Sequence, residues 1–240
     1  MSKKKILLKG LILTGLFMLS VSTACAEPCK ADANCDGRVS VWDYILFKQE
    51  FGRKCDPCIT APVPKTGQTT CYDTDGNVID CAGTGQDGEY QKGVAWPNPR
   101  FTDNGDGTVT DNLTGLIWLE DANCFGERTW SQALSDCNGL ASGDCGLTDG
   151  SSAGQWRLPN RFELESLLHL GFYNPAVPNT AGTGKWTEGD PFTNVQYLYW
   201  SSTTGATNAS YAWYVSMYNG YMHYYYKSNH DYVWPVRGGQ

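Results

Sequence analysis

The feature that most constrains the fold is a pair of short runs with alternating side chains near the C-terminus, at residues 211–218 and 221–226. Between them stands Asn219-Gly220, a dipeptide that strongly favours a two-residue turn between antiparallel strands. The pattern predicts a β-hairpin. We therefore expect the domain to contain a twisted antiparallel sheet that ends in this hairpin.

A two-residue turn fixes the register of the predicted hairpin by counting. Tyr218 would oppose Tyr221, followed by the pairs Met217 with Met222, Ser216 with His223, Val215 with Tyr224, and Tyr214 with Tyr225. Directly opposed residues share a face of a sheet. One face is therefore expected to join the core with Trp213, Val215, Met217, Met222 and Tyr224. The other is expected to point toward water with Tyr214, Ser216, Tyr218, Tyr221, His223 and Tyr225.

Tyrosine is concentrated in this region, since eight of the chain's 14 Tyr lie between residues 211 and 232. Core packing does not require such a concentration, because each buried hydroxyl would need its own hydrogen-bond partner. Tyr, Ser, Asn and His are also the residue types of antibody-like binding surfaces. We interpret the region as a ligand-binding surface; the alternative is an aromatic edge hairpin that only covers the sheet. The predicted binding residues are Tyr214, Ser216, Tyr218, Asn219, Tyr221, His223, Tyr225 and Tyr226, with Asn229, His230 and Asp231 in a following loop.

Composition and motifs argue against a nucleic-acid partner and against catalysis. The 240 residues carry 18 Lys and Arg against 25 Asp and Glu, so a broad basic surface is not expected. The sequence has neither a His-Glu-x-x-His zinc helix nor a Gly-x-Ser-x-Gly nucleophile turn. His169 is expected to be structural, while His223 and His230 have no identifiable nucleophile or carboxylate partner. We predict that the protein is not an enzyme.

The N-terminus has the pattern of a cleavable signal peptide. Several lysines precede an apolar run at residues 10–21, and small residues follow as far as Ala26. The apolar run is well short of the about 20 residues that a spanning helix needs. We expect a signal peptide at residues 1–26 and a secreted, periplasmic or cell-surface protein without a stable membrane span. The rival interpretation is a lipoprotein that is lipidated at Cys25.

Export into an oxidising compartment favours disulfides. Cleavage after Ala26 would remove Cys25 from the chain's ten Cys and leave an odd number, which requires one free or intermolecular thiol. Cys137 is the candidate, because it falls on the apolar side of a predicted helix. The expected pairs in the main domain are Cys71 with Cys81 and Cys124 with Cys145.

Residues 27–54 have the pattern of a small calcium-binding module. The oxygen-bearing side chains occupy alternate positions of a loop, and the residue after them is Gly37, which permits a sharp turn. An apolar stripe follows, as in the helix after such a loop. The predicted Ca²⁺ ligands are Asp32, Asn34 and Asp36, the carbonyl of Arg38, and Asp43. This helical, EF-hand-like module resembles one half of a dockerin, and that resemblance implies a cohesin-like partner. The alternative is a loop that only stabilises the module.

Residues 55–65 are expected to be a linker rich in Pro and Cys. Pro57, Pro62 and Pro64 stiffen it. Cys55 and Cys58 could suggest a zinc site or thiol redox chemistry, but structural disulfides are the better default for an exported module.

From residue 66 to 240 the chain has the pattern of one α+β domain. Turn signals predict hairpins at residues 71–81 and 100–111, the first around Asp75-Gly76. Apolar periodicity predicts a helix near residues 129–141, and a second helix begins at Asn160, where Glu163 can complete a capping box. The domain is therefore expected to hold two helices beside its antiparallel sheet.

Four ordered motifs add a family resemblance: Gly-Asp-Gly-Thr-Val-Thr-Asp-Asn-Leu-Thr-Gly-Leu-Ile-Trp at 105–118, Trp-Arg-Leu-Pro-Asn at 156–160, Tyr-Trp-Ser-Ser-Thr-Thr at 199–204, and Val-Arg-Gly-Gly at 236–239. With these motifs the chain resembles the Lcl C-terminal domain family of bacterial exported proteins. The resemblance implies a C-type-lectin-like fold with two helices and a twisted antiparallel sheet that carries a ligand-facing surface.

The segment from Tyr218 to Val236 also resembles the variable tail of proteins that are diversified by retroelements. In such tails, miscopied adenines in Asn codons leave Asn, Tyr, His, Ser or Asp on a fixed lectin-like scaffold, and these types dominate the segment. The resemblance implies a diversified surface for an extracellular protein or glycan. Alternatives are a carbohydrate receptor of fixed specificity and a relative of the formylglycine-generating enzymes, whose chemistry needs Cys thiols that this chain lacks after Cys145.

Overall fold

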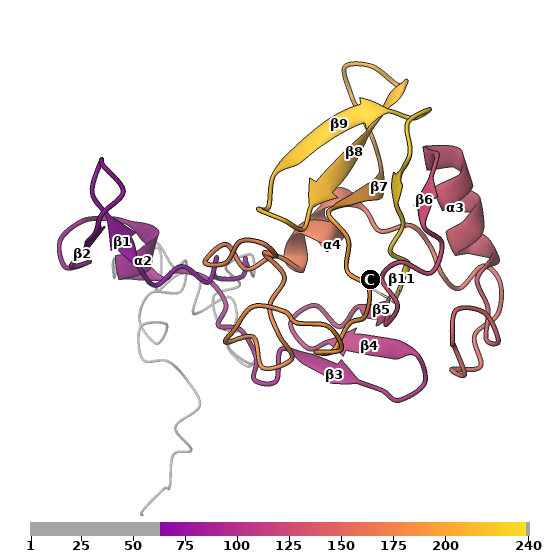
Figure 1. Ribbon diagram of the computed structural model, residues 1–240, viewed down its shortest axis with the longest axis horizontal. Helices are drawn as coiled ribbons and strands as arrows, with labels where there is room; N and C mark the ends of the chain where they lie inside the picture. Colours follow the sequence, from indigo (N-terminus) through magenta and orange to yellow (C-terminus); the bar gives the residue numbers. More distant parts are fainter. Residues whose placement is uncertain (1–62, 239–240) are drawn as a thin grey trace, which may run out of the picture. The chain divides into compact units, whose positions relative to one another are not determined.

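The computed structural model describes residues 63–238 of the chain. The predicted signal peptide, the calcium loop and most of the linker lie outside these residues, so the predictions made for them stay predictions. No helix in the described part is both long enough and apolar enough to cross a membrane. The described residues form a mixed α+β structure with two principal β-sheets and few helices, which confirms the predicted class (Figure 1).

The first elements form a small disulfide-linked hairpin. Strands β1 (Cys71–Tyr72) and β2 (Val78–Ile79) are antiparallel, and the short helix α2 (Asp87–Tyr90) follows them. The Asp73 carboxylate accepts hydrogen bonds from the backbone N–H groups of Asp75 and Asn77 and so organises the turn. Cys71 and Cys81 are bonded to each other, as the sequence predicts.

A four-stranded antiparallel sheet has the order β11-β5-β4-β3. Its strands are β3 (Phe101–Asp103), β4 (Thr108–Asp111), β5 (Ile117–Leu119) and the C-terminal β11 (Val236–Arg237). The pairing of β3 with β4 confirms the hairpin that was predicted at residues 100–111. Because β11 pairs with β5, the end of the described chain is fixed to its middle.

A five-stranded sheet has the order β6-β10-β7-β8-β9 and contains the predicted C-terminal hairpin. Its strands are β6 (Glu127–Arg128), β7 (Leu198–Thr204), β8 (Tyr211–Ser216), β9 (Met222–Tyr226) and β10 (Asp231–Tyr232). One pair, β10 with β7, is parallel, and the other pairs are antiparallel. Strand β9 lies at one edge of this sheet (Figure 1).

The two predicted helices are present. Helix α3 (Trp130–Gly139) begins at Thr129, and helix α4 (Arg161–Ser166) begins at Asn160, where the predicted capping box with Glu163 forms. Side chains of α4 share a core cluster with Tyr199, Val215 and the partly buried Met222 of the five-stranded sheet. Those of α3 share a second cluster with Trp200 and Ala212. The helices therefore pack on opposite faces of this sheet, because neighbouring residues of a strand point to opposite sides.

The remaining described cysteines also follow the predictions. Cys124 and Cys145 form a disulfide beside α3, with a Cα–Cα distance of 5.7 Å. Cys137 is unpaired and fully buried on α3. Burial raises the pKa of the Cys137 thiol well above its ordinary value, so this side chain packs as a small hydrophobic group and not as a reactive thiolate.

Candidate functional site

The C-terminal hairpin forms, but its register differs from the predicted one by two residues. Val215 opposes Met222, Tyr214 opposes His223, and Trp213 opposes Tyr224. The Ser216 N–H donates to the Tyr221 carbonyl at 2.8 Å, so the connection is a loop of the four residues Met217 to Gly220. The prediction of a two-residue Asn219-Gly220 turn is wrong.

Tertiary contacts of Met217 explain the longer loop. Its side chain is fully buried in the larger core cluster. Its N–H donates to the carbonyl of Tyr197 at 2.8 Å, and its carbonyl accepts from the N–H of Ala176 at 2.7 Å. These bonds draw Met217 out of the ladder with β9, which a turn propensity alone cannot reveal. Gly220 still supplies the positive φ, at +78°.

The shift by two residues keeps every side chain on its predicted face, because the side-chain period of a strand is two. Val215 and Met217 are fully buried and Met222 is half-buried, as predicted for the core face. Further along β9, the side chains of this face are no longer buried, since Tyr224 is 37% exposed and Tyr226 is 51% exposed. Strand β9 therefore exposes aromatic rings on both of its faces.

On the opposite face, the side chains of β8 are buried or half-buried and those of β9 are exposed. Tyr214 is half-buried and packs against the α3 cluster, and desolvation raises the pKa of its hydroxyl. Ser216 is also buried, and its Oγ accepts from the N–H of Tyr218 at 3.3 Å. The expectation that Tyr214 and Ser216 face water is wrong, because Tyr214 packs against the cluster that includes Ala133 and Cys137 of α3, and Ser216 is buried.

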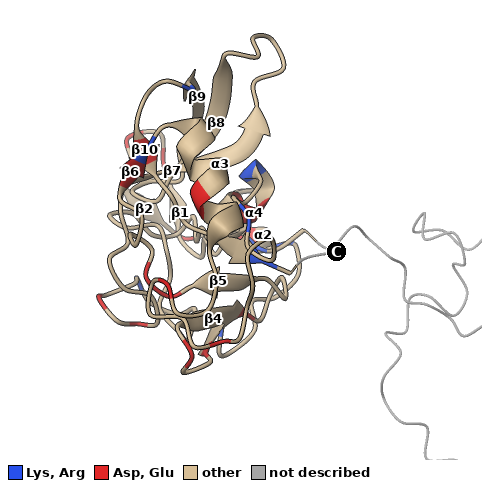
Figure 2. Ribbon diagram, turned by 90° about the vertical axis from the view of Figure 1, so that its right-hand side faces the viewer, with Lys and Arg blue, Asp and Glu red and all other residues tan. Residues whose placement is uncertain are grey.

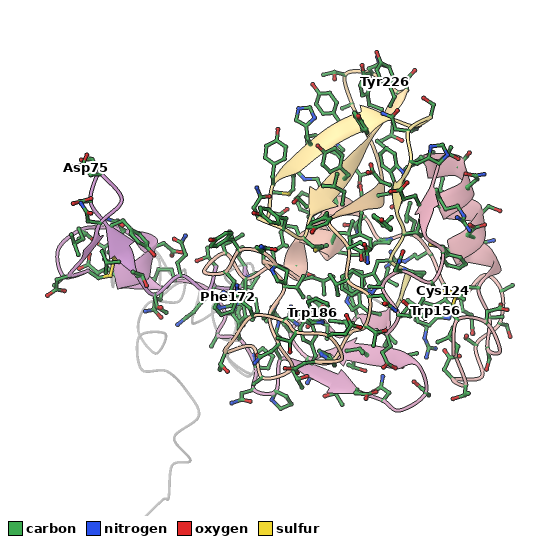
Figure 3. All side chains as sticks on the ribbon, viewed as in Figure 1. Asp75, Cys124, Trp156, Phe172, Trp186 and Tyr226 are labelled. Carbon is green, nitrogen blue, oxygen red and sulfur yellow. A yellow bond between two sulfur atoms is a disulfide. The ribbon has the colours of Figure 1, made fainter. Side chains whose placement is uncertain are left out.

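We call the exposed side chains of the hairpin the tyrosine surface. It comprises the side chains of Tyr218, Asn219, Tyr221, His223, Tyr224, Tyr225 and Tyr226, all of which are exposed. Tyr226 points away from the body of the domain beyond the end of β9 (Figure 3). All of these except Tyr224 are among the predicted binding residues. Tyr224 was expected in the core, and its exposure follows from the edge position of β9.

Ring contacts hold the tyrosine surface in place. Tyr226 lies 4.2 Å from Tyr211 between ring centroids, and Tyr224 lies 5.4 Å from Trp213 in an edge-to-face arrangement. Tyr221 stacks on His223 at 5.8 Å. Aromatic pairs of this kind add stabilisation beyond their buried area. A ligand would therefore meet rings with restricted motion, which lowers the entropic cost of binding.

The tyrosine surface carries no formal charge. Residues 211–226 contain no Asp, Glu, Lys or Arg, and β8 and β9 carry neither charged colour in Figure 2. The next cation, Lys227, lies 3.8 Å from the Trp130 ring and donates to Thr204 Oγ1 at 2.9 Å. Recognition here would depend on ring faces, hydroxyls and amides rather than on ion pairs.

The predicted loop after β9 is shorter than expected. His230 is exposed and Asn229 is half-buried, with its N–H donating to the Tyr226 carbonyl at 2.9 Å. Asp231 instead begins β10 and is only 6% exposed, so its placement on the binding surface is wrong. Desolvation, with Glu127 nearby, raises the pKa of Asp231 to about 7. The side chain is on the α3 face of the sheet, like Val233 two residues later.

The raised pKa of Asp231 predicts that the stability of the domain depends on pH. The folded state binds its proton more tightly than the unfolded chain, so the free energy of unfolding should fall as pH rises from about 4 to 7. Asp231→Asn removes this titration. In chemical denaturation, its stability advantage over the wild type should be larger at pH 8 than at pH 5. An equal advantage at both pH values would contradict the assignment.

Two exposed tyrosines outside the hairpin extend the candidate site and were missed by sequence reasoning. Tyr197 lies 6.1 Å from Tyr218 between ring centroids, and Tyr173 lies 6.3 Å from Tyr218. Both stand in segments without regular strand or helix, so no periodicity marks them. A hollow of about 210 Å³ lies beside them, lined by Asn174, Pro175, Trp186, Val195, Gln196, Tyr197, Met217 and Tyr218.

The candidate site presents aromatic rings, hydroxyls and amides, which can contact a ligand through ring faces and hydrogen bonds. Within residues 63–238 no group of three or more His, Cys, Asp or Glu could hold a metal ion. His223 contacts the Tyr224 carbonyl through Nδ1 at 2.8 Å, which is a backbone contact and not a pairing with a nucleophile. Burial lowers the pKa of His169, which stacks on Phe172 at 4.0 Å as a structural side chain would.

Comparison with known families gives one match. The family model of the Lcl C-terminal domain matches residues 107–237, from the turn before β4 to the last strand, β11. The matched segment is more than half of the chain and contains the entire hairpin of β8 and β9. No curated protein matches the chain.

Proposed function

Because the chain belongs to the Lcl C-terminal domain family, we propose that it is an exported protein that binds an extracellular protein or glycan through the tyrosine surface. The two disulfides of the described part support an oxidising, extracytoplasmic location. The proposed scaffold is C-type-lectin-like, and the curled sheets with two flanking helices are compatible with it.

One observation carries this proposal: β9 exposes three consecutive tyrosines, Tyr224, Tyr225 and Tyr226, at 37%, 47% and 51%. A strand that served only to cover the sheet would bury the rings of one face. Exposed rings that are held by aromatic contacts provide large contact area at low entropic cost, as in antibody-like surfaces. In this proposal the protein is a binding protein without catalytic activity.

We further propose that the surface is diversified by a retroelement. The residue types which such diversification leaves, Tyr, Asn and His, occupy the exposed positions of the hairpin, while the buried Val215 and Met217 are of other types. Sequencing the locus tests the idea. A reverse-transcriptase gene and a near-copy of the 218–236 coding segment that differs at adenines are expected. Absence of both would end it.

A carbohydrate receptor of fixed specificity is the second candidate. The hollow beside Tyr197 and Tyr218 favours it, because aromatic rings and the amides of Asn174 and Gln196 suit a neutral polar ligand. Screening the full chain on arrays of glycans and of extracellular proteins separates the candidates. Failure to bind any probe on either array would contradict both.

We also propose that the N-terminal residues form a calcium-binding module, as their sequence pattern predicts. Residues 27–54 would bind Ca²⁺ through Asp32, Asn34, Asp36, Arg38 and Asp43, and would either stabilise the module or recruit a cohesin-like partner.

A further inference from the structure

We infer that the ligand of the tyrosine surface is a polypeptide, and that an extended segment of it adds to the free edge of β9 as a sixth strand of the sheet. This inference rests on the proposed function and deepens it by naming the chemistry of the ligand.

The outer edge of β9 leaves backbone groups unpaired. Tyr221 accepts from Ser216, and Lys227 donates to Ser210, so odd-numbered residues of this strand direct their N–H and C=O groups toward β8. In an antiparallel ladder the alternate residues point the other way. The N–H groups of Met222, Tyr224 and Tyr226 therefore face outward, and no strand of the described part pairs with them.

This edge lacks the features that normally protect an edge strand. Short length, charged side chains, proline and bulges are the usual devices. The opposite edge of the same sheet shows two of them, since β6 has only the residues Glu127 and Arg128. Strand β9 has five residues, Met-His-Tyr-Tyr-Tyr, without charge or proline, and its register with β8 is continuous. Its edge is thus open to another strand.

The spacing of the free groups selects a polypeptide over a glycan. Outward N–H groups recur at every second residue, about 7 Å apart along a strand. The carbonyls of an added strand recur at the same interval, and its alternate side chains would contact the two exposed aromatic strips of β9. Tyr224 and Tyr226 form one strip, and His223 and Tyr225 form the other. This is the recognition mode in which main-chain hydrogen bonds give affinity and flanking side chains give specificity.

His223 occupies one acceptor of this edge in the free protein. Its Nδ1 lies 2.8 Å from the Tyr224 carbonyl oxygen, and it must be the donor because a carbonyl oxygen only accepts. The Tyr226 carbonyl is likewise occupied by the Asn229 N–H. An added strand therefore exchanges the His223 bond for a backbone bond, while the outward N–H groups gain partners that they lack in the free protein.

The test uses a displayed library of random 12-residue peptides panned on the full chain, in parallel with a glycan array. We expect the panning to select peptides that bind the full chain. Their affinity should fall at least tenfold more when the chain carries Tyr224→Pro than when it carries Tyr224→Ala. Both variants lose the ring, but only proline loses the outward N–H, and an edge strand accepts proline at such a position. Thermal melting checks that both variants fold.

A second measurement does not depend on the folding of the proline variant. N-methylation of single backbone amides in a selected peptide should weaken binding at least tenfold at alternate positions and little at the positions between. Tolerance of N-methylation at every position would overturn the inference, as would binding of glycans alone. If glycan binding is lost with alanine at Tyr221 and Tyr225, the proposed function stands and only the strand addition fails.

Discussion

Asp111→Ala is expected to destabilise the domain by about 3–5 kcal/mol, the largest loss predicted for any single substitution considered. Asp111 and Arg100 form an ion pair in which both side chains are fully buried. Removing the carboxylate leaves a guanidinium in the interior without its counter-charge. Burial already lowers the pKa of Arg100, which reflects the cost of holding this charge away from water.

The position of the pair in the fold adds to the expected loss. Asp111 ends β4, and its Oδ1 accepts from the N–H of Leu113 at 2.8 Å. Arg100 donates from Nη2 to the carbonyl of Ser166 at the end of α4, also at 2.8 Å, and lies 4.5 Å from the Phe101 ring. The pair thus connects the four-stranded sheet to the helix under the five-stranded one.

Urea denaturation measures this effect, with two controls. Asp75→Ala, in the exposed turn between β1 and β2, should change the free energy of unfolding by no more than about 0.5 kcal/mol. The double variant Arg100→Met with Asp111→Leu should recover much of the loss, because no unpaired charge remains buried. A loss below about 1 kcal/mol in Asp111→Ala would contradict the role of the pair.

Local signals predicted most of the scaffold. Asn160 and Glu163 mark the start of α4 because a capping box depends only on neighbouring residues. The disulfides Cys71–Cys81 and Cys124–Cys145 join residues that are close in sequence. The grouping of the hairpin side chains into two faces was predicted correctly although the register was not, since an even shift preserves the side-chain alternation.

The errors come from contacts between distant parts of the chain. Met217 leaves the turn because Tyr197 and Ala176 bind its backbone. Tyr214 is half-buried because it packs against a cluster that includes side chains of α3, some 80 residues earlier. Asp231 enters a strand because β6 and β7 are available to pair with it. None of these partners has a local sequence signal that joins it to the hairpin.

Replacing both Tyr221 and Tyr225 by alanine is the second large expected effect. The two side chains are 53% and 47% exposed, so their removal leaves no cavity in the core. Central interface tyrosines contribute about 1–2 kcal/mol each or more, and the double variant should therefore bind about 30-fold more weakly or worse. The melting temperature should stay close to that of the wild type.

Matched controls come from exposed tyrosines elsewhere. Tyr72 on β1 and Tyr90 on α2 are 47% and 58% exposed and lie outside the segment that matches the family. Tyr72→Ala with Tyr90→Ala removes the same number of phenol rings from the protein. It should leave the affinity unchanged if the ligand contacts the tyrosine surface alone.

The most direct measurement is the dissociation constant of a ligand selected on the wild-type chain, determined for both double variants at equal concentration and pH. We expect a loss of about 30-fold or more for the Tyr221 and Tyr225 variant and no change for the Tyr72 and Tyr90 variant. Unchanged affinity in the first, with the fold intact, would contradict the assignment of Tyr221 and Tyr225 to the ligand-binding surface.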